Sequence, residues 1–440
     1  MRNPYIVGRW LRGADHYGRQ KLIEHLLTTS DQAIWLVGTR RMGKTSLLRQ
    51  LEWVIEQDPQ STLVPLFWDI QACESAEDLA YEMFISIEDE TDRFERLGID
   101  IASLQAMDAN RILRSLQRAL SSQGKQLLLL IDEAEALINV AKNDNRELAR
   151  LRRTLQQGEH RTILTATKQL MHLNELMRDW LTSPFLFGFN LVNLWSLDID
   201  AAQSLVRQEQ NETEIVVDQR VMEEVIVYTH RHPYLTQYLC LRLFELDENG
   251  VGRLRPVESD DLQADHLLSG FFQIDYDHLS PTERQILLAI ARHGVVDSES
   301  VAAELAISSP ATLERFIYGM NKLGYLRQIL GGWSIGNEFL RRWVLENQND
   351  LARQLLSRVS DEGVEALLVE GRRFELDYLR NEVSLLQQRQ EDQLARRAAY
   401  GEDVPLELSQ ALLQTRREIE VARQQIHLLS TDPATAPVPA

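Results

Sequence analysis

Short runs with the character of strands recur through the first half of the chain, at 33–37, 63–69, 127–131, 161–168 and 185–194. The run at 127–131 is apolar throughout, which is typical of a central parallel strand that is covered on both faces. Stretches with the apolar spacing of amphipathic helices lie between these runs, at 75–87, 108–120 and 146–157. Because strands alternate with helices, the pattern predicts an α/β fold with a mainly parallel, doubly wound sheet.

The part of the chain from residue 196 to residue 347 is predicted to be mostly helical. A helical lid is expected from the amphipathic stretches 198–208, 218–228 and 234–245. Ser280, Pro281 and Glu283 then supply an N-cap, a first-turn proline and a capping-box acid. Three helices and a strand hairpin follow, at 281–292, 298–305, 310–323, 325–329 and 332–335. This order of elements predicts a winged helix.

Beyond residue 347, two series of residues follow a spacing of three and four positions, and most of their members are apolar. The first series is Leu376, Leu379, Val383, Leu386, Gln390 and Gln393. The second series is Leu408, Leu412, Thr415, Ile419, Ala422, Ile426 and Leu429. A polar break at 400–405 separates them, so the pattern predicts a helical hairpin or coiled coil. We expect this part to bind protein partners or to support oligomerisation, and the Pro/Ala-rich tail at 431–440 to be disordered.

The first apolar run leads into a glycine-rich loop and then into a helix. Residues 38–45 have the pattern G-x-x-x-x-G-K-T of a P-loop. Gly38 and Gly43 allow main-chain angles that turn the loop amides inward, and the helix beginning near Lys44 adds its positive end. Lys44 is expected to reach the β and γ phosphates of a nucleoside triphosphate, and the Thr45 hydroxyl to ligate Mg²⁺. The nucleotide-binding loop comprises Gly38, Thr39, Arg40, Arg41, Met42, Gly43, Lys44, Thr45 and Ser46.

The apolar run at 127–131 ends in two acidic residues, Asp132 and Glu133. Ligands of parallel sheets bind at the carboxyl ends of the strands. Asp132 is therefore expected to hold hydrated Mg²⁺, and Glu133 to polarise the water that attacks the γ phosphate. A loop start or helix cap is the alternative for such a pair. The P-loop upstream favours the functional interpretation.

The strand at 161–168 ends in a polar turn that would lie beside the γ phosphate. Thr167 or Lys168 is the candidate sensor of that phosphate, although a plain strand end is an alternative. An arginine finger would imply head-to-tail assembly of protomers. The sequence does not choose among its candidates, Arg146, Arg150, Arg152 and Arg153.

Charge and cysteine content narrow the function classes. The formal net charge of −19 disfavours nucleic acid as the main partner, because a protein that neutralises many DNA phosphates usually carries a basic surface. Cys73 and Cys240 are the only cysteines, which fits a reducing cytoplasm rather than a disulfide framework. No apolar run has the length of a membrane span, and the N-terminus lacks a signal-peptide pattern. A cytoplasmic location without membrane contact is expected.

Four motifs follow one another along residues 3–345. They are Asn3-Pro4-Tyr5 through Tyr17-Gly18-Arg19, the loop 38–46 with its basic pair, Asp132-Glu133, and His230-Arg231-His232-Pro233-Tyr234-Leu235. Together they resemble the STAND ATPases related to AAA+ proteins, in particular a compact bacterial and archaeal group with a winged helix after the ATPase core. The resemblance implies that ATP and ADP are the ligands, that Arg19 and Pro233 lie beside the adenine, and that the winged helix folds back as part of a nucleotide switch.

The sequence departs from that family at three positions. His230 and Arg231 stand where the family usually has glycine, and Gln20 stands where an acidic residue is common. Without the resemblance, Pro233 is interpreted as the first residue of a helix. Gly18 is interpreted as a turn before the helix at 20–27.

These inferences divide the chain into six predicted parts. They are an N-terminal segment at 1–30, a P-loop ATPase core at 31–195, a helical lid at 196–277, a winged helix at 278–347, a helical hairpin or coiled coil at 348–430 and the tail at 431–440.

The leading functional hypothesis is a molecular switch that binds ATP and hydrolyses it slowly. Nucleotide state would set the orientation of the lid and winged helix, and so control oligomerisation and partner binding. The alternative is a DNA-handling AAA+ ATPase of the initiator or transposition-regulator type. Its recognition helix would begin at 308–316, where Arg315 lies among apolar and acidic neighbours, which is poor in basic residues for a DNA reader. A scaffold that holds nucleotide without turnover is disfavoured by Asp132 and Glu133.

Overall fold

The computed structural model describes residues 2–173, 185–186, 188–210, 215–305, 307, 310–362 and 406–431, with scattered positions between 380 and 397. The chain divides into two compact units, Met1–Gln263 and Ala264–Ala440. Within the described ranges, no helix is both long and apolar enough to cross a lipid bilayer.

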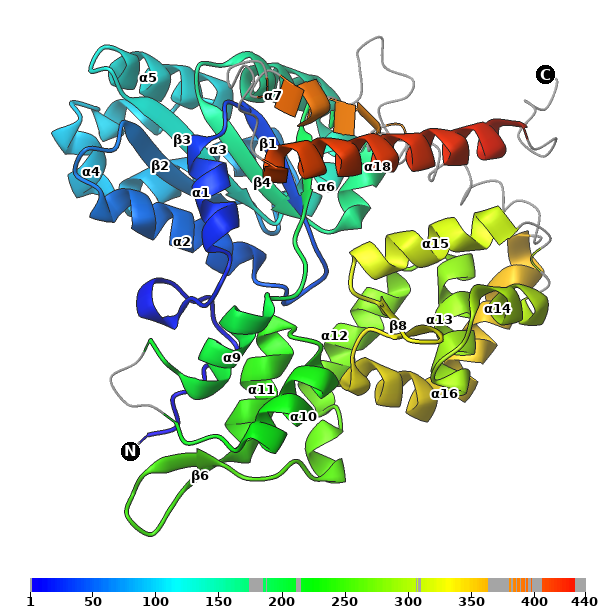
Figure 1. Cartoon of the computed structure of the whole chain (residues 1–440). Helices are drawn as coiled ribbons and strands as arrows, with labels where there is room; N and C mark the ends of the chain where they lie inside the picture. The colour runs from blue at the N-terminus through cyan, green and yellow to red at the C-terminus, as the bar shows by residue number, and fades with distance from the viewer. Residues whose placement is uncertain are drawn as a thin grey trace. The chain divides into compact units, whose positions relative to one another are not determined.

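Five parallel strands form the central sheet of the first unit (Figure 1). They are β1 (Ala33–Val37), β2 (Leu63–Asp69), β3 (Gln126–Asp132), β4 (Arg161–Ala166) and β5 (Asn190–Asn193). Their order is β2-β3-β4-β1-β5, so β4 lies between β1 and β3. Every residue of β1 and β4 is buried, which explains why β1 is apolar throughout, and β4 also buries Arg161, Thr162 and Thr165. The predicted α/β fold with a mainly parallel sheet is confirmed.

Helices pack against this sheet, with α2 and α3 against β2, α5 against β3 and α7 against β4. Aliphatic side chains of α1, α2 and the strands form one core, in which Leu36, Leu47 and Leu128 are fully buried. The α-helices are α1 (Gln20–Thr28), α2 (Lys44–Gln57), α3 (Ala76–Glu88), α4 (Thr91–Arg96), α5 (Ala109–Ser121), α6 (Leu137–Asn143) and α7 (Asn145–Gln157). Short 3₁₀ helices are η1 (Gly13–Asp15), η2 (Ile101–Leu104), η3 (Ala134–Ala136) and η4 (Lys168–Met171).

The last strand of the sheet is shorter than predicted. The sequence pattern placed a strand over 185–194, whereas β5 covers only Asn190–Asn193. Gly188 adopts a φ of 101°, which departs from extended geometry. Phe189 then donates its backbone N–H to the carbonyl of Leu186, so the residues before β5 form a turn.

A small helical group completes the first unit. It contains α9 (Ile199–Arg207), α10 (Gln219–Thr229), α11 (Pro233–Leu243) and η5 (Ser259–Leu262). The prediction of a helix through Glu245 is wrong at its end, because α11 stops at Leu243 and β6 (Phe244–Leu246) pairs with β7 (Gly252–Leu254). The turn between them is fixed by Asp247, whose Oδ1 accepts from the backbone N–H groups of Asn249 and Val251.

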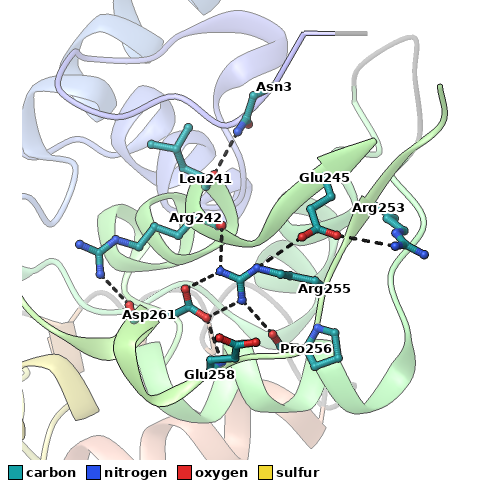
Figure 2. A network of polar contacts seen from close by, with 9 residues as sticks. All are labelled: Asn3, Leu241, Arg242, Glu245, Arg253, Arg255, Pro256, Glu258 and Asp261. Carbon is teal, nitrogen blue, oxygen red and sulfur yellow. Dashed lines mark hydrogen bonds and ion pairs between the residues drawn. The ribbon is translucent and has the colours of Figure 1, made fainter. Parts of the chain in front are cut away.

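An arginine-centred polar network holds this hairpin and η5 to α11 (Figure 2). Arg255 donates to both carboxylate oxygens of Asp261 at 2.6 Å and lies 3.6 Å from a Glu245 oxygen. Arg242 of α11 donates to the main-chain oxygen of Asp261 at 2.7 Å. On another side of α11, Asn3 donates to the carbonyl of Leu241 at 3.0 Å, which attaches the N-terminal segment.

The second unit contains the predicted three helices and hairpin. The capping box of Ser280 and Glu283 is present at the start of α13. The elements are α12 (His266–Asp277), α13 (Pro281–His293), α14 (Ser298–Glu304), α15 (Pro310–Lys322), β8 (Leu326–Ile329), β9 (Gly332–Ile335), α16 (Glu338–Glu362) and α18 (Leu406–Thr431). Helix α16 is continuous across residue 347, where the sequence character changes, and α12 had no counterpart among the predicted elements.

The predicted C-terminal hairpin is described only in part. Leu376, Leu379 and the break at 400–405 lie outside the described residues, as do residues 432–440 of the predicted tail. The second series forms the described helix α18, in which Leu412, Thr415, Ile419 and Ala422 are buried. That burial follows the apolar spacing on which the helix was predicted.

Gly18 allows the N-terminal segment to approach α9 closely. Its φ is 76°, in the left-handed region that favours glycine. A Cβ at this position would lie 2.7 Å from Cβ of Ala201 and 3.2 Å from Cδ2 of Leu197. Both backbone geometry and space therefore require glycine here.

Replacing Gly18 with alanine is expected to lower the free energy of unfolding by about 2–4 kcal/mol, because left-handed strain and overpacking act together. Gly98 is a matched control, since its φ is 73° and a Cβ there would meet no atom within 4 Å. Gly98→Ala should cost only the backbone strain, about 1–2 kcal/mol. Urea unfolding of both variants measures the difference, and equal losses would contradict the close contact with α9.

Candidate functional site

The candidate P-loop joins β1 to the start of α2. Gly43 is the N-cap of α2 with a φ of 88°, and Lys44 is the first helical residue. The ammonium of Lys44, which is 7% exposed, donates to the carbonyls of Gly38 and Thr39 at 3.2 Å each. Lys44 therefore lies over its own loop, at the positive end of α2, where an anion is stabilised.

The polar residues at the ends of β3 and β4 lie at the same edge of the sheet as this loop. Asp132 ends β3 and is 2% exposed. Its Oδ1 accepts a hydrogen bond from the hydroxyl of Thr165, in the neighbouring strand β4. This bond orients the carboxylate, and it involves only one of the two carboxylate oxygens.

The oxygen donors at this edge fit a magnesium ion. Asp132 and the Thr45 hydroxyl are hard ligands of the kind that Mg²⁺ takes together with water and phosphate oxygens. Among the described residues, no three His, Cys, Asp or Glu side chains cluster as a metal cage.

Glu133 lies in a strongly charged environment beside Asp132. Its φ of 53° places it in the left-handed region directly after the strand. Burial raises the pKa of its carboxyl, and Glu135 raises that pKa further, while Lys44 and Arg40 oppose the shift. A carboxylate whose pKa is raised is a stronger base, which suits the activation of water.

Thr167 is the first residue after β4. This strand lies between β1, which leads to the P-loop, and β3, which ends in Asp132. It is 6% exposed and caps η4, with its Oγ1 accepting from the backbone N–H of Gln169 at 3.4 Å. Its own backbone N–H donates to the Glu135 carboxylate. Sequence analysis missed Glu135, and the only available signal was a third acid two positions after Glu133.

Arg19 and Pro233 both lie against the P-loop. Arg19 donates from Nη2 to the carbonyl of Met42 at 2.8 Å and to that of Trp195 at 3.0 Å. Burial lowers the pKa of Arg19 to about 10, although Asp198 acts in the opposite direction. A Cβ built on Gly43 would lie 4.0 Å from Cγ of Pro233, the first residue of α11. Two residues implied by the family resemblance are thus placed beside the loop.

The two residues that replace family glycines keep glycine-like geometry. His230 and Arg231 have φ values of 49° and 59°, both in the left-handed region. The carbonyl of Arg231 accepts from the backbone N–H of Leu197 at 3.0 Å, which fixes the turn before α11. Two residues with side chains therefore hold left-handed geometry before α11, which costs local strain.

The remaining loop residues have distinct surroundings. The Ser46 hydroxyl accepts from the backbone N–H of Leu11 at 3.0 Å, so its side chain holds the N-terminal segment. Met42 is buried, and the guanidinium of Arg41 lies 5.4 Å from the ring centroid of Tyr234. Arg40 contributes charge near Glu133.

Comparisons with known proteins agree with this geometry. Residues 27–173 match the model of a family described as the AAA domain. This range includes the P-loop, Asp132, Glu133 and Thr167, so the chain carries an AAA-type ATPase domain. No curated protein sequence matches the chain.

Solved structures with a similar fold include a Walker-type ATPase of Pyrococcus abyssi. It has 17% sequence identity and a TM-score of 0.56, over 78% of this chain and 99% of that one. The Aeropyrum pernix ORC2 protein, in ADPNP–ADP complexes, has 13% identity and a TM-score of 0.45, over 80% and 97% of the two chains. The Thermotoga maritima RuvB Holliday junction branch migration motor has 14% identity and a TM-score of 0.34, over 72% and 92%. The first of these supports the fold alone.

The buried histidine His16 should make the first unit sensitive to mild acid. Burial, and then the charge of Arg19, lower the pKa of His16 to about 4 from an ordinary value of 6.5. Between these values the unfolded chain binds more protons than the folded chain, so stability falls as pH falls. The contribution of His16 to that loss should be about 1 kcal/mol between pH 7.5 and pH 5.5.

Urea unfolding at the two pH values measures this effect. His16→Gln should reduce the pH-dependent loss by about 1 kcal/mol. An unaltered pH dependence in His16→Gln would show that the imidazole titrates normally in the folded chain.

Proposed function

We propose that this chain is a magnesium-dependent ATPase of STAND type whose nucleotide state works as a molecular switch. The observation that supports it most directly is the arrangement at one sheet edge of Lys44, Asp132 and Glu133. The charge of Lys44, which lowers the pKa of Glu133 against the effect of burial, supports the assignment of the P-loop lysine and the acidic pair to one site.

Each residue of the site has a proposed role in ATP hydrolysis. The amides of loop 38–46 and Lys44 bind the phosphates, while Thr45 and Asp132 hold Mg²⁺, which would neutralise developing charge. Glu133 accepts a proton from the attacking water, and Thr167 contacts the γ phosphate. Arg19 and Pro233 border the adenine. The preference for ATP over GTP rests on the family resemblance.

The hydrogen bonds of Arg19 support a role in switching. One arginine links the P-loop carbonyl of Met42 to Trp195, on the connection from β5 to α9. A change in the loop on nucleotide exchange would therefore act directly on the segment that leads into the lid. Slow hydrolysis would time the return to the ADP state, and the outcome would be nucleotide-dependent oligomerisation and binding of cytoplasmic protein partners through the C-terminal helices.

The winged-helix interpretation of α13–α15 and β8–β9 leads to a second candidate function, DNA handling. The order of three helices and an antiparallel hairpin favours it. The chemistry of α15 does not, because Arg315 is only 5% exposed and Lys322 lies 5.0 Å from the ring of Tyr318. We therefore propose a regulatory role for this part and treat DNA as the alternative.

Substitution Glu133→Gln should preserve ATP binding and reduce turnover by about 10²–10⁴-fold, because the amide cannot accept the proton of water. Steady-state phosphate release and titration with a fluorescent ATP analogue separate the two effects. Glu88→Gln, on the exposed side of α3, is the matched control and should behave as wild type. Undiminished turnover in Glu133→Gln would show that Glu133 is not the base that activates water.

The purified protein should change its assembly state with ATP and hydrolyse ATP at a rate that does not depend on DNA. Light scattering with ATP, ADP or no nucleotide, and hydrolysis rates with and without duplex DNA, test both statements. Assembly or turnover that requires DNA would contradict the switch hypothesis and favour the DNA-handling alternative.

A further inference from the structure

One side of α11 carries a continuous stack of aromatic and cationic side chains. Tyr234, Tyr238 and Arg242 follow one another at four-residue intervals, which places them on one helix face. The rings of Tyr234 and Tyr238 are stacked, with centroids 6.0 Å apart and an interplanar angle of 16°. The Arg242 guanidinium lies 4.3 Å from the Tyr238 ring, and that of Arg41 lies 5.4 Å from the Tyr234 ring. We call these four residues the α11 ladder.

The far end of the ladder holds the last residues of the first unit. Arg242 donates from Nη1 to the carbonyls of Asp261 and Gln263, at 2.7 Å each, and from Nη2 to the Tyr238 hydroxyl (Figure 2 shows the Asp261 bond). Gln263 is the residue at which the first unit ends. Two residues later, Asp265 caps α12 by accepting from the backbone N–H of Leu268 at 2.8 Å. Arg242 therefore restrains the segment that joins the two units.

The near end of the ladder is part of the P-loop. Arg41 is exposed and has a φ of 61°. It lies two residues before Gly43, and Gly43 in turn lies beside Pro233. A guanidinium forms stronger bonds with a phosphate, which it can engage through two charged hydrogen bonds, than with the face of an aromatic ring. A polyphosphate in the loop would therefore compete with Tyr234 for Arg41.

We propose that Arg41 exchanges Tyr234 for the nucleotide phosphates, and that the α11 ladder thereby reports nucleotide occupancy to residues 261–265. In one state Arg41 holds the Tyr234 ring against Tyr238, and Arg242 restrains the joining segment. In the other state Arg41 bonds to phosphate, Tyr234 loses its cationic partner while Tyr238 keeps Arg242, and the restraint weakens. The inference rests on the proposed function, because it requires a nucleotide in the loop.

The exchange supplies the differential contact that a two-state response needs. Nucleotide favours the released state because it gains the Arg41–phosphate bond only there. The contact with Tyr234 must be broken for that gain, so it opposes nucleotide binding. This opposition distinguishes the ladder from a structural support of the site, whose removal would weaken binding.

Two measurements on the full chain test the proposal, namely affinity for a non-hydrolysable ATP analogue with Mg²⁺ and hydrogen exchange of the amides at 261–268. In the wild-type chain, the analogue should raise exchange of these amides several-fold. Tyr234→Leu should bind the analogue about two- to five-fold more tightly, which corresponds to the loss of one cation–π contact. Its exchange at 261–268 should already be fast and no longer respond to the analogue.

Arg242→Met breaks the far end of the ladder without altering the contact at the loop. Because coupling between two sites is reciprocal, it should bind the analogue at least as tightly as the wild-type chain, and it should show fast exchange at 261–268 in every state. Tyr81→Leu, at a tyrosine of α3 that is 62% exposed, is the matched control and should retain both the affinity and the response.

Distinct outcomes overturn the inference and the proposed function. Wild-type chain that binds the analogue with no change at 261–268 would overturn the ladder and leave the ATPase proposal intact. Weaker binding in Tyr234→Leu, or a response of 261–268 that persists in Arg242→Met, would also overturn it. Absence of any nucleotide binding by the wild-type chain would overturn both.

Discussion

The pairing of β4 with β1 on one side and β3 on the other is the constraint on which the candidate site depends. Parallel strands end at the same edge of a sheet, so their register decides which polar groups meet there. Val37 pairs with Ala166, and Ile131 pairs with Leu164. The P-loop, Thr167 and Asp132 therefore arrive at one edge from segments that are far apart in sequence. Rigid strands rather than loops determine this placement.

The N-terminal segment makes the phosphate loop and the small helical group parts of one structure. Leu11 contacts α2 through Ser46, whereas the Tyr5 hydroxyl donates to the carbonyl of Val206 in α9. Arg19 adds bonds to the loop itself and to the connection that follows β5. Because these contacts bridge elements on both sides of the loop, a movement of the loop cannot leave α9 and α11 unaffected.

Strong local patterns account for the parts of the structure that sequence analysis predicted. The unalternating run that ends at Asp132, the glycine loop before Lys44 and the capping box at Ser280 each carry their information within a few residues. The hairpin β6–β7 was missed because a helix pattern was extended across Phe244 to Glu245, which took up most of β6 before the turn at 247–250. Contacts such as Glu135 with Thr167 and Arg41 with Tyr234 join segments that are distant in sequence, so no local sequence pattern predicts them. The roles assigned to the site residues remain predictions.

Helix α16 has a mechanical consequence for the second unit. It runs for 25 residues without interruption from Glu338, directly after β9, to Glu362. At about 1.5 Å per residue it is a rod of about 37 Å. Its first turns are fixed by Phe339, Trp343 and Val344, which are buried. Leu351 and Leu355 are buried as well, so the helix is anchored over about five turns and can move only together with the elements that it packs against, α12, α13 and β9.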